Sequence, residues 1–307
     1  MSLRRRGLLQ AYTSVILMGI GITVVQTIDL PPQTQVWYRV ITALPGLLLF
    51  ALLSGQSLRL ELRFRRPLFA AALLTACHWI ALFFSITMST VAAGMISFFS
   101  YPVFSTLFEA VLQKRKPFRK DVVISGLSFL GVLLLTPLTG ASLEMLPGVC
   151  VGVVSAVFWA ARMVLIHHRL RELSGLNMMF WSMIVMSVFL LPTLWDTTPP
   201  WQWTHATLRS VLILGLFVTA FCQTLLLSSL RHLSATLVGQ VSPIQIVSAS
   251  LAGWFFLQEP LTLRIVAGGI MIASTGIVAA LLSGKAVQTE KSSLIKNQVA
   301  GKPKIRC

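Results

Sequence analysis

Long runs of apolar residues, separated by short polar segments, dominate the pattern along the chain. A helix needs about 20 apolar residues to cross the hydrocarbon core of a bilayer, and ten runs have roughly this length. We expect spans at residues 8–28, 34–54, 68–86, 91–112, 120–136, 147–167, 175–195, 208–229, 234–257 and 262–283. Runs of this length predict helices, because the strands of a membrane barrel would alternate in polarity over about ten residues. The predicted fold class is all-α integral membrane.

The two halves of the chain, residues 8–136 and 147–283, hold five predicted spans each. Because five is an odd number, the second half enters the membrane from the side opposite to the first. Ser100-Tyr101-Pro102-Val103 near the middle of the fourth span matches Val241-Ser242-Pro243-Ile244 near the middle of the ninth. We therefore expect ten transmembrane helices arranged as two inverted five-helix repeats, as in many membrane carriers.

The positions of lysine and arginine indicate the orientation. Of the 25 basic residues, all but four fall in the terminal segments or in links on one side of the membrane. Arg209 and Arg264 lie on the other side, and Arg39 and Arg162 lie within predicted spans. The positive-inside rule then places both termini in the cytoplasm and favours the inner membrane of the cell.

Composition agrees with a membrane protein, since 55% of the 307 residues are hydrophobic and only 11% are charged. The net charge of +16 does not predict nucleic-acid binding, because the basic residues are dispersed between apolar runs and form no single basic face. We expect residues 1–7 to form a short cytoplasmic N-terminus and residues 284–307 a disordered basic tail. The four cysteines and the acidic residues show no metal-ligand spacing, so we expect neither a metal nor a cofactor. The pattern specifies no oligomeric state.

Several motifs resemble the EamA type of the drug/metabolite transporter superfamily, over nearly the whole chain. They are His78 to Phe84, Ser89 to Gly94, Tyr101 to Phe104 and Glu109 in the first half, and Leu233 to Thr236, Ser242-Pro243 and Leu257 to Thr262 in the second. Arg39 resembles the family's arginine in the second span. Where the family often has a glutamate after the fourth span, this chain has Arg115-Lys116, so only Glu259 could take that role. The resemblance implies a secondary carrier of small polar or amphipathic metabolites, with a central cavity lined mainly by spans 1, 3, 4, 6, 8 and 9.

Polar and aromatic residues near the middle of spans are candidates for a substrate cavity. His78 lies about halfway along the third span, where a polar ring needs a partner. It could bind substrate, carry a coupling proton or only join two helices. The candidate cavity residues are His78, Trp79, Tyr101, Trp159, Gln223, Gln240 and Gln245, a set that fits an uncharged or zwitterionic solute. Pro102 and Pro243 each remove a helix hydrogen bond and predict two kinks that shape this site.

Depth along the helices sorts the ionisable residues near the spans. Arg39 lies five residues from the outer end of the second span, and Asp29 caps the first span on that side. Arg162 and Glu109 lie near the inner ends of the sixth and fourth spans. We expect Arg39 to pair with Asp29 and Arg162 with Glu109, either as helix bridges or as gates. The alternative is that both arginines extend to the nearest interface.

These features predict a secondary transporter of small metabolites such as amino acids or related amphipathic solutes. It would act as an exporter by alternating access around a central cavity. Its partners would be the solute, the lipid bilayer and, as a candidate coupling ion, the proton, with Glu109 and His78 as candidate proton-linked groups. Downhill export without coupling is equally compatible with the sequence. One alternative is a flippase for lipid-linked substrates. The other is an intramembrane enzyme, which is disfavoured because the spans contain no GxSxG, HExxH or acid-rich pair.

Overall fold

The first half of the chain folds into helices of very different lengths. The computed structural model describes residues 2–22, 28, 30–89, 91–135, 143–194, 200–258 and 262–300. The helices of the first half are α1 (Leu3–Ile22), α2 (Pro32–Ser54), α3 (Leu62–Met88), α4 (Val91–Phe98), α5 (Tyr101–Leu112) and α6 (Arg119–Leu135). Every regular element in the described part of the chain is helical, as the long apolar runs predict.

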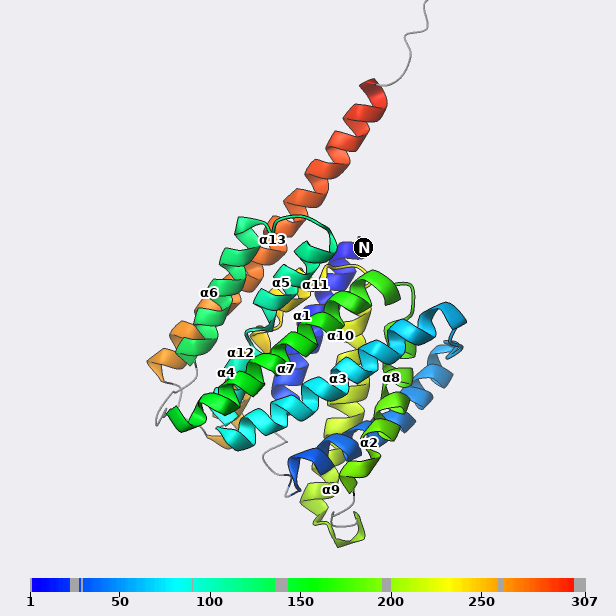
Figure 1. Cartoon of the computed structure of the whole chain (residues 1–307), viewed down its shortest axis with the longest axis vertical. Helices are drawn as coiled ribbons and strands as arrows, with labels where there is room; N and C mark the ends of the chain where they lie inside the picture. The colour runs from blue at the N-terminus through cyan, green and yellow to red at the C-terminus, as the bar shows by residue number, and fades with distance from the viewer. Residues whose placement is uncertain are drawn as a thin grey trace, which may run out of the picture.

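The second half repeats this organisation, with two π-helical segments within its long helices. Its main helices are α7 (Leu146–Leu165), η3 (Ile166–Leu170), α8 (Gly175–Phe189), α9 (His205–Leu212), η6 (Ile213–Gln223), α10 (Thr224–Ser229), α11 (Ala235–Val241), α12 (Ile244–Leu257) and α13 (Leu263–Ala300). The π-helical segments are η3 and η6. Such segments are rare and often occur at functional sites. Figure 1 shows the helices arranged as one bundle, beyond which the end of α13 extends.

Seven helical segments are long and apolar enough to cross a membrane. They are Thr34–Ser54, Leu62–Met88, Ala93–Leu112, Leu146–Leu170, His205–Ser229, Ala235–Phe256 and Leu263–Leu282. The helix α8 is a shorter apolar helix of 15 residues, and α6 has 17 residues. The chain is therefore a multi-pass membrane protein, and the count of ten spans remains a prediction.

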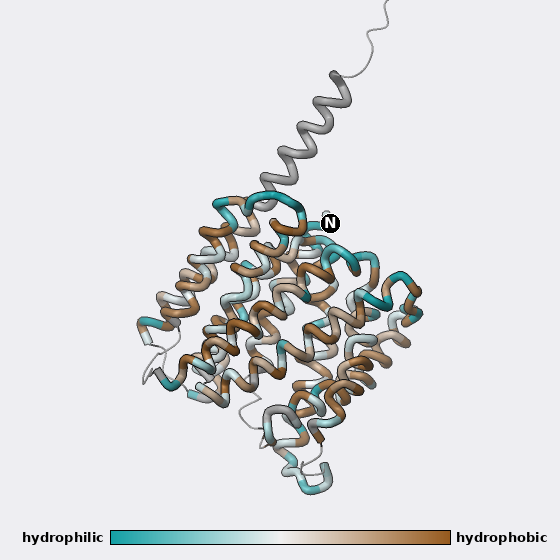
Figure 2. Tube along the Cα trace, viewed as in Figure 1, coloured by the Kyte–Doolittle hydropathy of each residue, from teal (hydrophilic) through white to brown (hydrophobic). Residues whose placement is uncertain are grey.

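The N-terminus and the last turns of α13 lie at the same end of the bundle (Figure 1). An arginine near the N-terminus, Arg4, donates a hydrogen bond to the carbonyl oxygen of Ala280 in α13. Hydrophilic links gather at this end (Figure 2), where Arg63 and Glu172 form an exposed ion pair at 3.0 Å. This end, which we call the basic end, carries the links that the sequence assigns to the cytoplasm.

Close helix packing brings distant segments of the chain together. The helix α3 lies along α7, and α6 lies along α13 (Figure 1). Small residues permit this approach, as is usual between membrane helices. A Cβ atom on Gly152 of α7 would lie 2.5 Å from Cβ of Ser97 and 2.6 Å from Oγ of Ser85. No larger residue fits at this crossing unless the helices move apart.

Two helices are interrupted at the matching prolines. Pro102 has no N–H group, and the helix ends at Phe98 before α5 begins at Tyr101. The second break separates α11 from α12 at Ser242 and Pro243. Tight turns cross both breaks, with Val103 N–H donating to Ser100 O at 3.0 Å and Gln245 N–H donating to Ser242 O at 2.9 Å. Backbone of this kind is tolerated in a membrane where it is enclosed by protein.

Candidate functional site

His78 is anchored between α3 and α7 by a reciprocal contact with Ser155. The imidazole is 3% exposed, and its Nδ1 lies 2.7 Å from Oγ and 3.2 Å from the carbonyl oxygen of Ser155. The Ser155 hydroxyl in turn donates to the carbonyl oxygen of His78 at 3.1 Å. Because that hydroxyl proton is already used, Nδ1 is assigned as the donor of the neutral ring. Nε2 is then the acceptor nitrogen of the ring.

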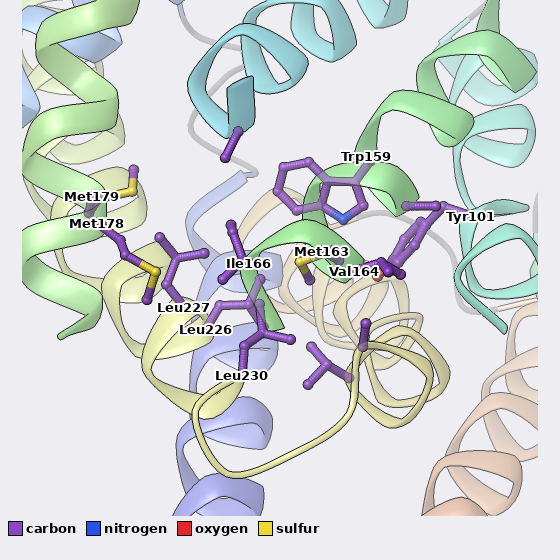
Figure 3. Packing of buried hydrophobic residues seen from close by; sticks show 14 of the residues in the cluster. Tyr101, Trp159, Met163, Val164, Ile166, Met178, Met179, Leu226, Leu227 and Leu230 are labelled. Carbon is purple, nitrogen blue, oxygen red and sulfur yellow. The ribbon is translucent and has the colours of Figure 1, made fainter. Parts of the chain in front are cut away.

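Two aromatic side chains contact this imidazole, and a third stacks on one of them. The ring centroid of His78 lies 4.7 Å from that of Trp159 and 4.8 Å from that of Phe98. Tyr101 stacks on Phe98 at 5.1 Å. Figure 3 shows Trp159 and Tyr101 close together, with Met163 of α7 next to the indole. We call His78, Trp79, Phe98, Tyr101 and Trp159 the central cluster; all are buried, and the breaks at the prolines lie beside it.

Two guanidinium groups adjoin the central cluster, and each rests on a tryptophan ring. The Cζ atom of Arg39 lies 4.5 Å from the ring centroid of Trp79, and that of Arg162 lies 4.6 Å from Trp159. Arg39 Nε also donates to Oγ1 of Thr219 in η6 at 2.5 Å. Such contacts stabilise a cation on an aromatic face. The arginines therefore add positive charge to an aromatic site.

The structure does not form the expected pair between Arg162 and Glu109. The Glu109 carboxylate, 2% exposed, accepts hydrogen bonds through Oε2 from the backbone N–H of Thr236 at 2.9 Å and from the Thr236 hydroxyl. Its Oε1 lies 3.9 Å from Nε2 of His167. Glu109 thus faces α11 and η3, whereas Arg162 lies over Trp159. Similar depth along two helices does not bring side chains together when the helices turn them in different directions.

A cluster of possible metal ligands surrounds this carboxylate. Glu109, His167 and His168 each offer a ligand atom within 4.8 Å of the others. The Nδ1 atom of His167 lies 3.0 Å from the carbonyl oxygen of Leu230, which orients the ring so that Nε2 faces Glu109. His167 and His168 are adjacent in the chain, and the π-helical turn η3 places their ring centroids 5.0 Å apart. We call these three residues the carboxylate–histidine cluster.

The other predicted site residues lie outside the central cluster. Gln240 is buried and donates from Nε2 to the carbonyl oxygen of Asp121 at 3.1 Å, so it joins α11 to α6. Gln223 is buried in η6, and its Oε1 has no hydrogen-bond partner among the described residues. Gln245 is half-buried in the first turn of α12. Asp29 lies outside the described residues, so its pairing with Arg39 stays a prediction.

Sequence reasoning missed three neutral residues that hold the charged and titratable groups. They are Ser155, which anchors His78, Thr219, which binds Arg39, and Thr236, which binds Glu109. Serine and threonine in apolar spans are common and carry little signal by themselves. Thr236 could have been found from its place in the motif Leu233 to Thr236 that the second half shares with known carriers.

Comparison with known proteins supports a single family. The sequence profile of the EamA-like transporter family matches residues 5–136 and again residues 146–282. The pseudopaline exporter CntI of Pseudomonas aeruginosa is 27% identical over 248 residues, covering 79% of this chain and 84% of that protein. The uncharacterized transporter YvbV of Bacillus subtilis is 26% identical, covering 76% of this chain and 78% of that protein.

A solved crystal structure shares the fold. It has a TM-score of 0.79 and 16% sequence identity, and the match covers 91% of this chain and 98% of that chain. The family match excludes the intramembrane-enzyme alternative, and a transporter implies a small-molecule solute. With both halves of the sequence matching one profile, this chain belongs to the EamA-like transporter family.

Proposed function

We propose that the protein exports small amphipathic metabolites across the inner membrane by alternating access, with both termini in the cytoplasm. The observation that carries this proposal is the central cluster with its two adjoining arginines. It combines buried aromatic surface with polar groups beside two helix breaks, as expected for a solute site at mid-membrane. Membership of the family and the 27% identity to a named exporter support the direction of transport.

We further propose ten spans in two inverted repeats, residues 8–136 and 147–283. Two matches to one family profile support this. The packing supports it as well: α4 and α5 pack on α7, and in the same way α12 packs on α1. The packing of α3 on α7 likewise corresponds to that of η6 and α10 on α1. The breaks at Pro102 and Pro243 occupy equivalent places in the two repeats.

We infer that the site is closed toward the basic end, because an apolar layer fills that side. Met163, Ile166, Leu227 and Leu230 are at most 2% exposed, and Figure 3 shows them packed together from α7, η3 and α10. Glu109 adds a polar link between α5 and α11 at the same end. Alternating access then requires these contacts to separate so that solute can enter from the cytoplasm.

A lipid-linked substrate flippase remains the second candidate, favoured by an apolar groove of about 390 Å³ between α3 and α8. Its lining is Phe69, Leu73, Ile184, Val185, Val188 and Phe189. The groove could hold an acyl chain, but its lining offers no group that would bind a polar headgroup. The exporter therefore accounts for more of the structure, because it uses the central cluster and both arginines.

The experiment is metabolite profiling of cells and medium with and without the protein. The best candidate solute is then followed in proteoliposomes under an imposed pH gradient. We expect a soluble metabolite to accumulate in the medium only when the protein is present. Dependence on the gradient decides whether protons drive transport. If only a lipid-linked product changes sides, the flippase is correct and the exporter is not.

A further inference from the structure

Arg162 is a buried cation whose hydrogen-bonding groups are unused. The side chain is 1% exposed, and Nε, Nη1 and Nη2 have no hydrogen-bond partner among the described residues. A guanidinium stays protonated in proteins, so burial cannot be relieved by loss of the proton. Buried charges are normally paired, because an unpaired one carries a large desolvation penalty. The guanidinium of Arg162 is therefore available to bind a ligand that supplies the missing hydrogen-bond acceptors.

No protein carboxylate neutralises this charge in the described part of the chain. Glu109 is the one buried acid there, and it is bound to Thr236 and faces His167. The second arginine, Arg39, is bound to a neutral hydroxyl. The central cluster is therefore flanked by two positive charges and contains no negative charge of its own.

The other unused group beside Arg162 is also a hydrogen-bond donor. The indole Nε1 of Trp159 is buried and makes no hydrogen bond to any of the described residues, and the Trp159 ring lies against the Arg162 guanidinium and against His78. A ligand at this place must therefore supply acceptors and negative charge. A carboxylate does both, and its two oxygens match the planar fork of a guanidinium. The neighbouring aromatic rings would cover an apolar body.

We propose that Arg162 binds the carboxylate of the transported solute, so that the substrates are small organic anions or zwitterions with an apolar or aromatic body. This inference rests on the proposed function and deepens it. Arg39, on the far side of the His78–Trp79 pair, adds long-range attraction for the same anion. The sequence alone favoured an uncharged or zwitterionic solute, and the unpaired guanidinium narrows the class to solutes that carry a carboxylate.

Thermal stability of the purified full-length protein in a neutral detergent tests binding with a matched probe pair. The probes are N-acetyltryptophan and its amide, which differ in the carboxylate. We expect the acid to raise Tm and the amide at equal concentration to leave it unchanged. Arg162→Gln should lower the affinity for the acid about 10- to 100-fold, which is the range expected for the loss of one charged hydrogen-bonding partner. Arg162→Lys keeps the positive charge but lacks the planar guanidinium that can bind both carboxylate oxygens, and it should lower the affinity for the acid less than Arg162→Gln does.

Ligand-free stability separates a binding role from a structural one. Arg162→Gln should keep or raise the Tm of the ligand-free protein, because it removes an unpaired buried charge. A purely structural arginine would lower Tm when replaced. Arg209→Gln, at an exposed position of α9, is the control and should change neither Tm nor the response to the acid.

Transport assays provide a second test of the role of Arg162. Solutes exported by cells should carry a carboxylate, and their export should fall with Arg162→Gln. The inference is overturned by equal responses to acid and amide, by an unchanged response in Arg162→Gln, or by no response to the acid. Export of neutral solutes alone also overturns it, and so does a Tm shift produced only by vesicles of an anionic phospholipid. Absence of any export contradicts the proposed function instead, while the probe pair still decides the role of Arg162.

Discussion

At the scale of single residues, the interior of this protein is organised by whether each buried polar group has a partner. His78 is hydrogen-bonded to Ser155 and Glu109 to Thr236, whereas the guanidinium of Arg162 has no hydrogen-bond partner in the part of the chain that the structure describes. The hydrocarbon core of the membrane contains no water that could form hydrogen bonds with a polar group lacking a protein partner. The paired groups hold neighbouring helices together, whereas the unpaired guanidinium of Arg162 is the group that we propose binds a ligand.

Two buried serines allow this distinction to be measured. Ser155→Ala removes the hydroxyl that holds His78, and we expect a loss of about 1 kcal/mol in stability together with weaker solute binding. Ser105 is equally buried, but its hydroxyl makes no hydrogen bond to any described residue. Ser105→Ala should therefore leave stability unchanged or raise it. Thermal unfolding in detergent and solute uptake check both variants, and equal losses of stability in the two would refute the argument.

At the scale of helices, the proline breaks and the small-residue crossings decide where side chains can meet. The break before Tyr101 sets the relation between α4 and α5, and with it the stacking of Tyr101 on Phe98. The crossing of α7 over α3 brings Trp159 to His78. Both features depend on small changes in backbone chemistry, so each can be tested by a single substitution.

Pro102→Ala restores the missing N–H group and should let the helix continue through the break. We expect stability to be maintained and transport to fall several-fold, because a continuous helix would change the orientation of the Tyr101 ring relative to that of Phe98. Pro67→Ala, in the early turns of α3, is the matched control and should transport normally. Transport in proteoliposomes measures both, and full activity of Pro102→Ala would show that the break is dispensable.

Gly152→Ala should destabilise the crossing of α7 with α3 and α4 by about 1–3 kcal/mol, because the added methyl group overlaps Ser97 and Ser85. Gly126→Ala is the control, since a Cβ there meets nothing within 4 Å. It should be neutral or stabilising by up to about 1 kcal/mol, owing to the better helix propensity of alanine. Thermal unfolding of the two variants side by side checks the prediction. A Gly152 variant as stable as the Gly126 variant would contradict the observed packing.

At the scale of the whole molecule, the link between Glu109 and Thr236 joins the proposed first repeat to the second at the basic end. The bond connects α5 to α11 beside the apolar layer that closes this end. Protonation of Glu109 would weaken its attraction for the N–H and hydroxyl donors, and in this way proton binding could be coupled to opening.

Glu109→Gln tests this coupling. The amide oxygen can still accept from Thr236, but the side chain no longer exchanges a proton. We expect transport to continue at the rate seen without a pH gradient and to lose its acceleration by the gradient. Glu172→Gln, an exposed acid whose side chain is 61% accessible, should retain the acceleration. The measurement is solute uptake by both variants with and without a pH gradient. A Glu109 variant whose uptake is still accelerated by the gradient would exclude this residue as the proton carrier.

The sequence by itself determined the environment and class of this protein. Apolar runs of about 20 residues specify membrane helices whatever their neighbours, and the family motifs are contiguous stretches such as His78 to Phe84. It also placed His78, Trp79, Tyr101 and Trp159 near the middle of their spans, because depth follows from position along a helix.

Only the tertiary structure decided which side chains meet. Arg162 and Glu109 have similar depths, yet helix rotation and the π-helical turn η3 direct Glu109 to Thr236 and His167 and leave Arg162 over Trp159. Glu109 and Thr236 are 127 positions apart in the sequence, and no local pattern encodes such a contact. The unpaired guanidinium of Arg162, on which the proposed carboxylate site rests, results from this packing of the helices and not from any local sequence pattern.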